Sequence, residues 1–154
     1  RRCRSGVRDL IVSAGQGAQF AGDEQGGFIF PALHAGFDAM FALVNLAQML
    51  KKSGYKLSDI VHSLPQFHLA YGKVDCPWET KGKVMRRLTE SQPPDARVDL
   101  VDGIKVYDND SWVLVLPDSF EPVFHVIAES PSPQQSREMV DDYVSRINIL
   151  RVGR

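Results

Sequence analysis

The stretch that most constrains the fold is residues 97–117, RVDLVDGIKVYDNDSWVLVLP. It contains an Asp-Gly pair, Asp102 and Gly103, between two apolar runs, and this arrangement is the strongest short-range signal for a β-hairpin. The segment that follows, SWVLVLP, is rich in β-branched and aromatic residues, which favour strands. Residues 97–117 therefore predict a hairpin and a third strand.

The residues around this hairpin predict the rest of an α+β domain. Strands are expected at residues 67–77 and 121–130, and helices at 78–90 and 132–150. Pro77 suits the first turn of one helix, where a missing N–H costs nothing, and Ser132 or Ser130 can cap the other. From residue 64 the order is β-α-β-β-β-β-α, which predicts a sheet with its helices on one face.

The first part of the chain has an α/β character. Elements are expected as a short helix at 5–15, short strands at 18–23 and 27–32, and a long helix within 37–55. Gly54 is expected to end the long helix, and Ser58 to cap a short helix at 57–64. We therefore divide the chain into residues 1–55, a linker helix at 56–63, and the α+β domain at 64–154.

Composition excludes several classes of protein. The chain has 154 residues, 44% hydrophobic and 24% charged, which suits one medium or two small globular domains. A net charge of −1 does not attract nucleic acid or an anionic membrane, and no apolar run reaches the roughly 18 residues of a membrane span. Cys3 and Cys76 are far apart, which argues against zinc and disulfides and favours the cytoplasm. Because the chain begins at Arg1 without a methionine, we expect a fragment of a longer protein.

A loop of carboxylates and glycines lies at residues 21–30, AGDEQGGFIF. Asp23 and Glu24 can accept hydrogen bonds from hydroxyl groups, and Gln25 can both donate and accept. Such groups can hold a sugar, and the glycines let the backbone approach a ligand closely. The same residues also suit a solvated glycine-rich turn, and the spacing alone favours that turn.

Histidine–carboxylate pairs occur twice at four-residue spacing: His34 with Asp38, and His125 with Glu129. One such pair supplies too few ligands for a metal site. We therefore interpret the histidines as surface or packed residues, with His34 the best placed to contact a ligand beside the 21–30 loop.

Two other segments could bind phosphate. One is a basic helix face, which could equally be solvated: Lys81, Arg86 and Arg87. The other is residues 116–122, LPDSFEP, a polar loop between two strands whose backbone N–H groups could hold an anion. Asp118 and Glu121 in that loop would repel an anion, so charge alone favours a structural role.

Several segments, read in order, resemble the α-D-phosphohexomutase superfamily, specifically the C-terminal part of phosphomannomutase/phosphoglucomutase. They are FAGDEQGGFIFPALHAGFDAMFALVNLAQML, LPQFHLAYGKVDCPWETKGKVMRRL, DGIKVY and WVLVLPDSFEPVFHVIAES. The resemblance covers nearly the whole chain and extends to bacterial chains that join a mannose-1-phosphate guanylyltransferase to a phosphomannomutase-like region.

The resemblance implies a four-domain parent enzyme. Residues 1–55 would be the end of its α/β domain three, and residues 64–154 its domain four, which resembles the TATA-binding-protein fold. The family's sugar-binding loop, G-E-x-S-G-H, falls on residues 22–27, so the expected substrate-binding residues here are Asp23, Glu24 and Gln25. Gly27 takes the position of the family's histidine.

The family's phosphate loop, R-x-S-N-T-E-P, falls on residues 116–122. The positions that stay compatible are Ser119, Glu121 and Pro122, and Ser119 is expected to contact substrate. Leu116 replaces the arginine that holds phosphate through charge-assisted bonds, and Phe120 replaces the threonine. A third family segment, T-K-x-G-H, falls near residues 3–7, where Val7 replaces the histidine.

The resemblance is compatible with two functions. In the first, the parent interconverts hexose 1-phosphate and 6-phosphate with a phosphoserine and Mg²⁺ held by earlier domains, so this chain carries no catalytic or metal-binding residue. Its partners would be a phosphorylated hexose, the preceding domains of the same polypeptide and, in a homo-oligomer, further copies of the protein. If the same chain also carries a guanylyltransferase, the mutase and guanylyltransferase reactions would together supply GDP-mannose.

In the second, the region is a degenerate, non-catalytic module that supports or oligomerises an attached nucleotidyltransferase, in line with Leu116, Val7 and Gly27. A third possibility is that the TATA-binding-protein-like fold binds an unrelated ligand. The near-neutral net charge argues against nucleic acid as that ligand.

Overall fold

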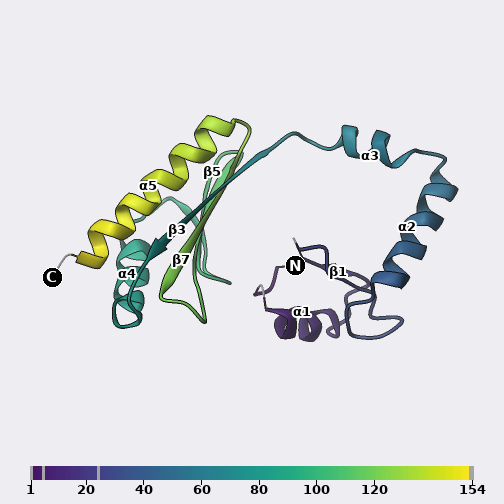
Figure 1. Ribbon diagram of the computed structural model, residues 1–154, viewed down its shortest axis with the longest axis horizontal. Coiled ribbons are helices and arrows are strands. Elements are labelled where there is room, and N and C mark those ends of the chain that lie inside the picture. The colour runs from purple at the N-terminus through teal and green to yellow at the C-terminus, as the bar shows by residue number, and fades with distance from the viewer. Residues whose placement is uncertain (1, 5, 24, 153–154) are drawn as a thin grey trace. The chain divides into compact units, whose positions relative to one another are not determined.

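The structure is a computed structural model that describes residues 2–4, 6–23 and 25–152 (Figure 1). It divides into two compact units, Arg1–Pro65 and Gln66–Arg154, here called the N-terminal and C-terminal units. Each unit has its own elements and is described by itself.

The C-terminal unit is an antiparallel sheet covered by helices. Its elements are β3 (His68–Asp75), α4 (Trp78–Glu90), β4 (Arg97–Asp99), β5 (Ile104–Asp108), β6 (Ser111–Pro117), β7 (Val123–Ser130) and α5 (Pro133–Val152). The five strands have the order β3-β7-β6-β5-β4, and every neighbouring pair is antiparallel. The predicted β-α-β-β-β-β-α order is confirmed, and the bounds of α4 agree with the sequence prediction.

The hairpin between β4 and β5 is wider than the sequence suggested. β4 ends at Asp99, so four residues, not two, connect it to β5. Gly103 has φ +66°, and a Cβ at this position would lie 2.2 Å from the Val115 carbonyl oxygen. Glycine is therefore required here both by the backbone conformation and by the close approach of β6.

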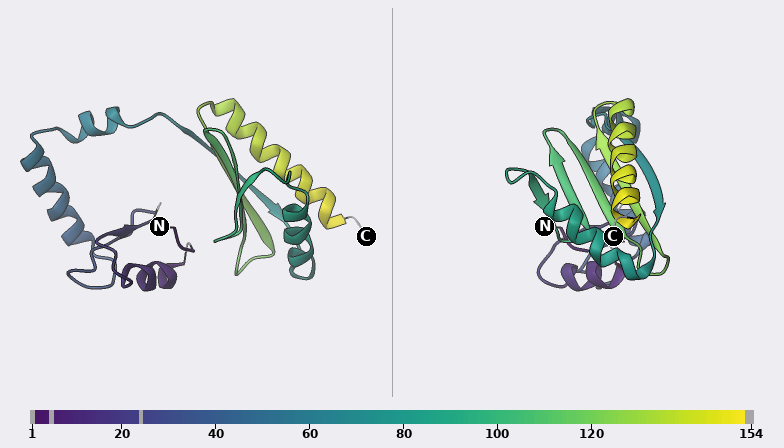
Figure 2. Two further views of the ribbon diagram at one scale, coloured as in Figure 1. Left: turned by 180° about the vertical axis from the view of Figure 1, so that it is seen from behind. Right: turned by 90° about the vertical axis from the view of Figure 1, so that its left-hand side faces the viewer.

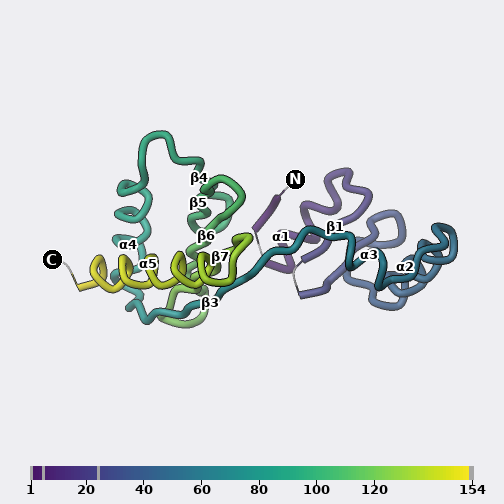
Figure 3. The backbone as a smooth tube through the Cα atoms, turned by 90° about the horizontal axis from the view of Figure 1, so that it is seen from above, coloured from purple at the N-terminus to yellow at the C-terminus, as the bar shows by residue number. Residues whose placement is uncertain are grey.

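One face of the sheet forms the core of the C-terminal unit. Alternate strand residues share this face through the register, as in the rows Val74–Phe124 and Gly72–Val126–Val115. α5 lies along β3 and β7 on this face, and α4 packs beside α5 (Figures 2 and 3). Helix α5 lies close against β3: a Cβ on Gly72 would lie 2.6 Å from Val140 of α5.

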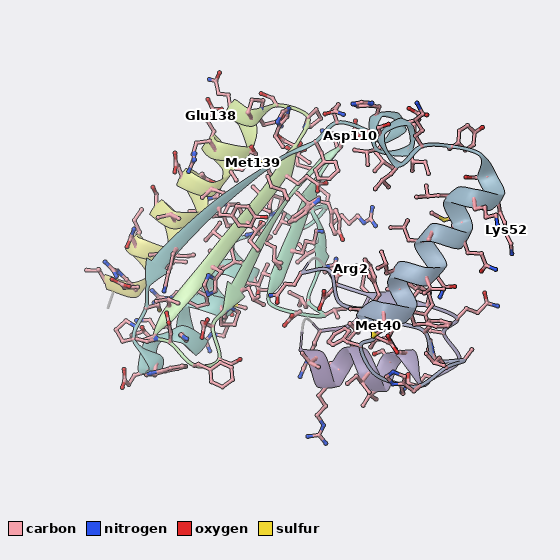
Figure 4. All side chains as sticks on the ribbon, turned by 45° about the vertical axis from the view of Figure 1, so that its right-hand side comes forward. Arg2, Met40, Lys52, Asp110, Glu138 and Met139 are labelled. Atoms are coloured by element: carbon pink, nitrogen blue, oxygen red, sulfur yellow. The ribbon has the colours of Figure 1, made fainter. Side chains whose placement is uncertain are left out.

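The closing helix α5 is capped as expected from the sequence. Ser132 Oγ accepts a hydrogen bond from Gln135 N at 3.5 Å. Glu138 and Met139, labelled in Figure 4, illustrate the two faces of the helix: Glu138 is exposed, whereas Met139 packs against the core.

The N-terminal unit has short elements and few buried residues. It contains α1 (Val7–Ala14), β1 (Ala21–Gly22), β2 (Phe28–Ile29), α2 (Ala39–Ser53) and α3 (Leu57–Ser63). Among its described residues, the buried apolar side chains are those of Ala14 and Ile29. Helix α2 buries none of its residues, and Met40 near its start is 82% exposed; Lys52, near its end, is labelled with Met40 in Figure 4.

The ends of these helices test the predicted caps. Asp38 caps α2 by accepting a hydrogen bond from Phe41 N at 2.8 Å, and Gly54 ends it in the left-handed conformation at φ 74°, as predicted. Ser58 is not the cap of α3, because that helix begins at Leu57 and its cap position is Lys56, two residues earlier, which makes no side-chain cap. No helix among the described residues is both long and apolar enough to cross a bilayer.

Candidate functional site

The acidic loop at residues 23–27 connects two short paired strands. β1 and β2 are antiparallel, with Ala21 opposite Ile29 and Gly22 opposite Phe28. Asp23 begins the loop, and its backbone N–H donates to the Gly27 carbonyl at 3.1 Å. The prediction of two strands on either side of this loop is confirmed, although each strand is only two residues long.

The Asp23 carboxylate is fixed by the loop's own backbone. Its Oδ1 accepts hydrogen bonds from Gln25 N at 3.1 Å and from Gly27 N at 2.7 Å. Among the described residues, both bonds to this carboxylate fall on Oδ1, which leaves Oδ2 as an acceptor for a ligand hydroxyl. Gln25 is exposed in the same loop. The third predicted residue, Glu24, lies outside the described residues.

Backbone conformation and steric contact explain why two positions of this loop are glycine. Gly26 has φ +85°, a conformation that favours glycine. At Gly27 a Cβ would lie 2.5 Å from the Phe37 ring, so the aromatic ring occupies the space of a side chain there. A side chain at position 27, where the resemblance implied a histidine, would therefore have to displace the Phe37 ring.

His34 forms the pair that its spacing suggested. Its Nε2 lies 3.4 Å from Asp38 Oδ2, and the His34 side chain is half exposed. Hydrogen bonding to the Phe41 N–H, with a smaller contribution from His34, holds the pKa of the Asp38 carboxyl below its usual value. Asp38 acts first as a helix cap, and the pair supplies no metal site.

The second loop with an ordered carboxylate is residues 118–121, between β6 and β7. Asp118 Oδ1 accepts hydrogen bonds from Phe120 N and Glu121 N, both at 2.7 Å. Its Oδ2 lies 2.9 Å from His125 Nε2. The His125 hydrogen bond first, and then the two backbone N–H groups, hold the pKa of Asp118 well below its usual range.

Two lysines from neighbouring elements contact this loop, one through its backbone and one through a side chain. Lys81, on α4, is 8% exposed, and its ammonium donates to the carbonyls of Asp118 at 2.6 Å and of Glu121 at 2.5 Å. Lys73, on β3, pairs with the Glu121 carboxylate at 2.5 Å.

The structure changes the interpretation of the basic helix face that contains Lys81. Lys81 is buried under the 118–121 loop and is not part of a solvated or phosphate-binding face, while Arg86 lies 3.6 Å from Glu90 on the exposed side. The signal for burial was present in the sequence, because Lys81, Val84 and Leu88 follow helical spacing and all three are buried.

The sequence also suggested the wrong partner for His125. Glu129, four residues on, accepts a hydrogen bond from the Trp112 indole at 2.9 Å, while His125 pairs with Asp118. The predicted contact residue Ser119 is exposed, and Phe120 beside it is 93% exposed. Val7, at the family's other histidine position, begins α1 and is exposed.

The described part of the chain contains no candidate metal-binding site. No group of three His, Cys, Asp or Glu side chains comes close enough together there to hold an ion. Both cysteines, Cys3 and Cys76, are free thiols.

Comparisons with known proteins find similarity between this chain and parts of sugar-phosphate mutases. No family model matches the chain. It is 33% identical over 146 residues to a probable phosphoglucosamine mutase of Methanopyrus kandleri, covering 92% of this chain and 32% of the relative. It is 28% identical over 141 residues to a phosphoglucomutase/phosphomannomutase of Thermococcus kodakarensis, covering 90% of this chain and 31% of the relative.

A solved structure supports the fold. A phosphoglucomutase/phosphomannomutase family protein of Burkholderia thailandensis superposes with a TM-score of 0.78 at 20% identity, covering 98% of this chain and 32% of that one. The chain is homologous to the C-terminal portion of phosphohexomutases, and it spans about a third of the length of the curated relatives it matches.

Proposed function

We propose that this chain is the C-terminal part of a phosphohexomutase that interconverts hexose 1-phosphate and 6-phosphate, and that residues 23–27 bind the sugar hydroxyls. Similarity to two curated mutases over about nine-tenths of the chain supports the proposal. The observation that carries the site is the geometry of Asp23, whose Oδ1 is fixed by two backbone N–H groups. A carboxylate fixed in this way accepts a hydroxyl with little loss of side-chain entropy.

Each residue of the proposed site has a stated role. Asp23 accepts hydrogen bonds from ring hydroxyls, and Gln25 donates to or accepts from a neighbouring hydroxyl. Glu24 and Ser119 are proposed as further contacts on sequence grounds. The phosphoserine and the Mg²⁺ ligands belong to preceding domains in this proposal; the described residues of this chain do not fit a metal, and none takes part in a step through one.

The proposed substrate is a phosphorylated hexose. The relatives carry the names phosphoglucosamine mutase and phosphoglucomutase/phosphomannomutase, so glucosamine, glucose and mannose phosphates are the candidates. A cytoplasmic location belongs to the same proposal and agrees with two free thiols. Assembly into a homo-oligomer is a further part of it.

The activity is tested with the full-length parent protein. We expect Mg²⁺-dependent conversion of at least one of glucosamine 6-phosphate, glucose 1-phosphate and mannose 1-phosphate, followed by ³¹P NMR. Absence of turnover on all three, in a folded protein that contains the preceding domains, would contradict the proposal.

The Asp23 site is tested separately by binding. In the full-length parent, Asp23→Ala should weaken hexose-phosphate binding about 10- to 100-fold, since a hydrogen bond to a charged group contributes about 1.5–3 kcal/mol. The matched control is Asp59→Ala, which removes an exposed carboxylate at the start of α3 in the same unit. Equal affinities for both variants in calorimetric titration would remove Asp23 from the site.

A second function is favoured by the 116–122 loop. Leu116 stands where the family places a phosphate-binding arginine, and the loop's N–H groups are occupied by Asp118. On this reading the region is a non-catalytic module that supports or oligomerises an attached nucleotidyltransferase, such as a mannose-1-phosphate guanylyltransferase. A parent with nucleotidyltransferase activity but no mutase activity, and with less of that activity once this region is deleted, would favour it.

A further inference from the structure

We infer that the outer edge of β3 is a pairing site for a second copy of this chain, and that this pairing joins two five-stranded sheets into one. In the dimer the two β3 strands run antiparallel, with Tyr71 of each copy opposite Tyr71 of the other. This dimer specifies the homo-oligomer that the proposed function includes, and it rests on that part of the proposal. Its formation involves the C-terminal unit and requires no mutase activity.

The outer edge of β3 carries backbone groups that its neighbour β7 does not use. β3 is the last strand on one side of the sheet, and β4 is the last on the other (Figure 3). Cys76, directly after β3, donates its N–H to the carbonyl of Pro122, directly before β7, at 2.7 Å, so the even-numbered residues of β3 bond to β7. Successive residues of an antiparallel strand alternate between its two sides. The N–H and C=O groups of Leu69, Tyr71 and Lys73 therefore point away from β7.

The free part of this edge is centred on Tyr71. At one end, the carbonyl of Asp75 accepts a hydrogen bond from the Arg151 guanidinium of α5 at 2.6 Å. Among the described residues, no loop or helix backbone bonds to Leu69, Tyr71 or Lys73 on the outer side. An antiparallel copy uses all three residues when Tyr71 lies opposite itself, which gives three opposed pairs that each exchange two hydrogen bonds. Because this pairing is two-fold symmetric, it closes after two copies.

The side chains along this edge suit antiparallel pairing of two identical strands. They lie on the sheet face opposite α5, since the even-numbered residues Ala70 and Val74 fill the core. Tyr71 is 62% exposed and Leu69 is also exposed, and two opposed aromatic side chains stabilise an antiparallel pair. The two copies of Lys73 would lie at opposite ends, each facing Leu69. Parallel pairing in register would instead bring the two lysines together, which is destabilising.

The two edges of the sheet differ in how they are protected against further strands. β4 is only three residues long, and its Arg97 covers the Tyr107 ring at 4.4 Å. β3 has eight residues, with no proline and no break in its register with β7. A lysine commonly protects such an edge, but Lys73 is paired with Glu121 of the same chain. A long edge whose lysine is neutralised is suited to adding a strand.

Sedimentation equilibrium of the 154-residue chain tests whether the dimer forms through this edge. The wild type should show a concentration-dependent equilibrium between monomer and dimer. Tyr71→Lys places two like charges opposite each other at the centre of the pair, so it should weaken the dimer at least about tenfold. Phe120→Lys is the matched control, because it makes the same change of charge at an aromatic side chain that is 93% exposed in the same unit. It should leave association unchanged.

Disulfide crosslinking tests the register of the two strands. Opposed residues of a hydrogen-bonded antiparallel pair have Cα atoms about 5.5 Å apart, which a disulfide can span. In a Cys3→Ser background, with Cys76 buried, Tyr71→Cys should therefore give a covalent dimer on mild oxidation. Leu69→Cys is the matched control: its two copies would lie about 13 Å apart along the strands, too far for a disulfide. Non-reducing gel electrophoresis reads both variants.

Three results would overturn the inference. A wild-type chain that stays monomeric would leave the edge to an extended segment of another protein. A Tyr71→Lys chain that associates as the wild type does would place the contact on another surface. A Leu69→Cys chain that crosslinks as well as Tyr71→Cys would exclude this register. Because neither readout needs turnover, an active but monomeric mutase would contradict only the dimer, and an inactive parent whose chain crosslinks at position 71 would contradict only the mutase activity.

Discussion

The two units of the chain differ in how far they bury their own apolar side chains. The C-terminal unit has a continuous core that joins all five strands to α4 and α5, with Phe124 and Ile147 fully buried. In the N-terminal unit, α2 buries no residue, and Met40, Leu43 and Val44 are each more than 60% exposed. Helices in proteins gain most of their stability from packing an apolar face.

The larger core and the proposed sugar site lie in different units. The C-terminal unit buries more apolar side chains, whereas the proposed sugar loop at residues 23–27 lies in the unit with the smaller core. The Asp23 loop is ordered by local hydrogen bonds, while the Asp118 loop is also held by a buried lysine from α4. The two ordered carboxylates thus depend on different kinds of support.

The largest expected effect comes from separating the units. Residues 66–154 expressed alone should fold and unfold cooperatively, because their core is complete within that unit. Residues 1–65 alone should show no cooperative transition, because they bury too little apolar surface. Far-UV circular dichroism during urea unfolding measures both. A cooperative transition in residues 1–65 would break the comparison.

A core substitution should be felt in the C-terminal unit. Phe124→Ala should lower its free energy of unfolding by about 3–5 kcal/mol, the usual cost of emptying a fully buried phenylalanine site. Phe120→Ala is the matched control: it removes the same side chain at 93% exposure and should change stability little. Urea denaturation of residues 66–154 measures both, and similar losses would place the core elsewhere.

The hairpin glycine should be the next most sensitive position. Gly103→Ala should destabilise the C-terminal unit by at least about 1–2 kcal/mol from its positive φ alone. The contact with the Val115 carbonyl adds to that cost, because backbone must move to relieve it. Gly82→Ala, in the exposed interior of α4 with open space at Cβ, should instead stabilise by about 0.5–1 kcal/mol. Thermal unfolding of both variants checks the opposite signs.

The smallest expected effect concerns pH. The pKa of Asp118 is lowered in the folded state, chiefly by His125, so its ionised form stabilises the fold. This contribution is complete above the ordinary Asp pKa of 3.8 and is lost as the pH falls through the lowered folded pKa. The stability difference between wild type and Asp118→Asn should therefore shrink as the pH is lowered below about 3.8. A difference that is constant across acid denaturation curves would contradict this assignment.

Sequence reasoning was most successful where local rules decide the structure. The bounds of α4, the end of α2 at Gly54 and the order of elements after residue 66 all follow from periodicity, glycine and proline. The Ser58 cap was wrong because the cap position of α3 is Lys56, two residues earlier. That shift falls within the ordinary uncertainty of helix ends.

The contacts of the two loops could not be predicted, because they depend on tertiary structure. The sequence identified Asp23 and Gln25 by type, but the bonds to Asp23 Oδ1 and the Phe37 ring against Gly27 require the folded hairpin. Likewise, His125 pairs with Asp118 across a strand connection, so the four-residue spacing to Glu129 was misleading. The burial of Lys81 was foreseeable from its helical phase, but its two carbonyl partners were not.

The pairing of β3 with β7 also sets an order for folding. Strands β4 to β7 join their neighbours through short connections, whereas β3 must wait for β7, which follows α4 and three further strands. We expect the closing of that long loop to be the slowest of these contacts to form, because its entropy cost precedes any gain from packing. During synthesis we therefore expect β3 to stay unpaired until β7 has left the ribosome, and α5 to pack on both strands after that.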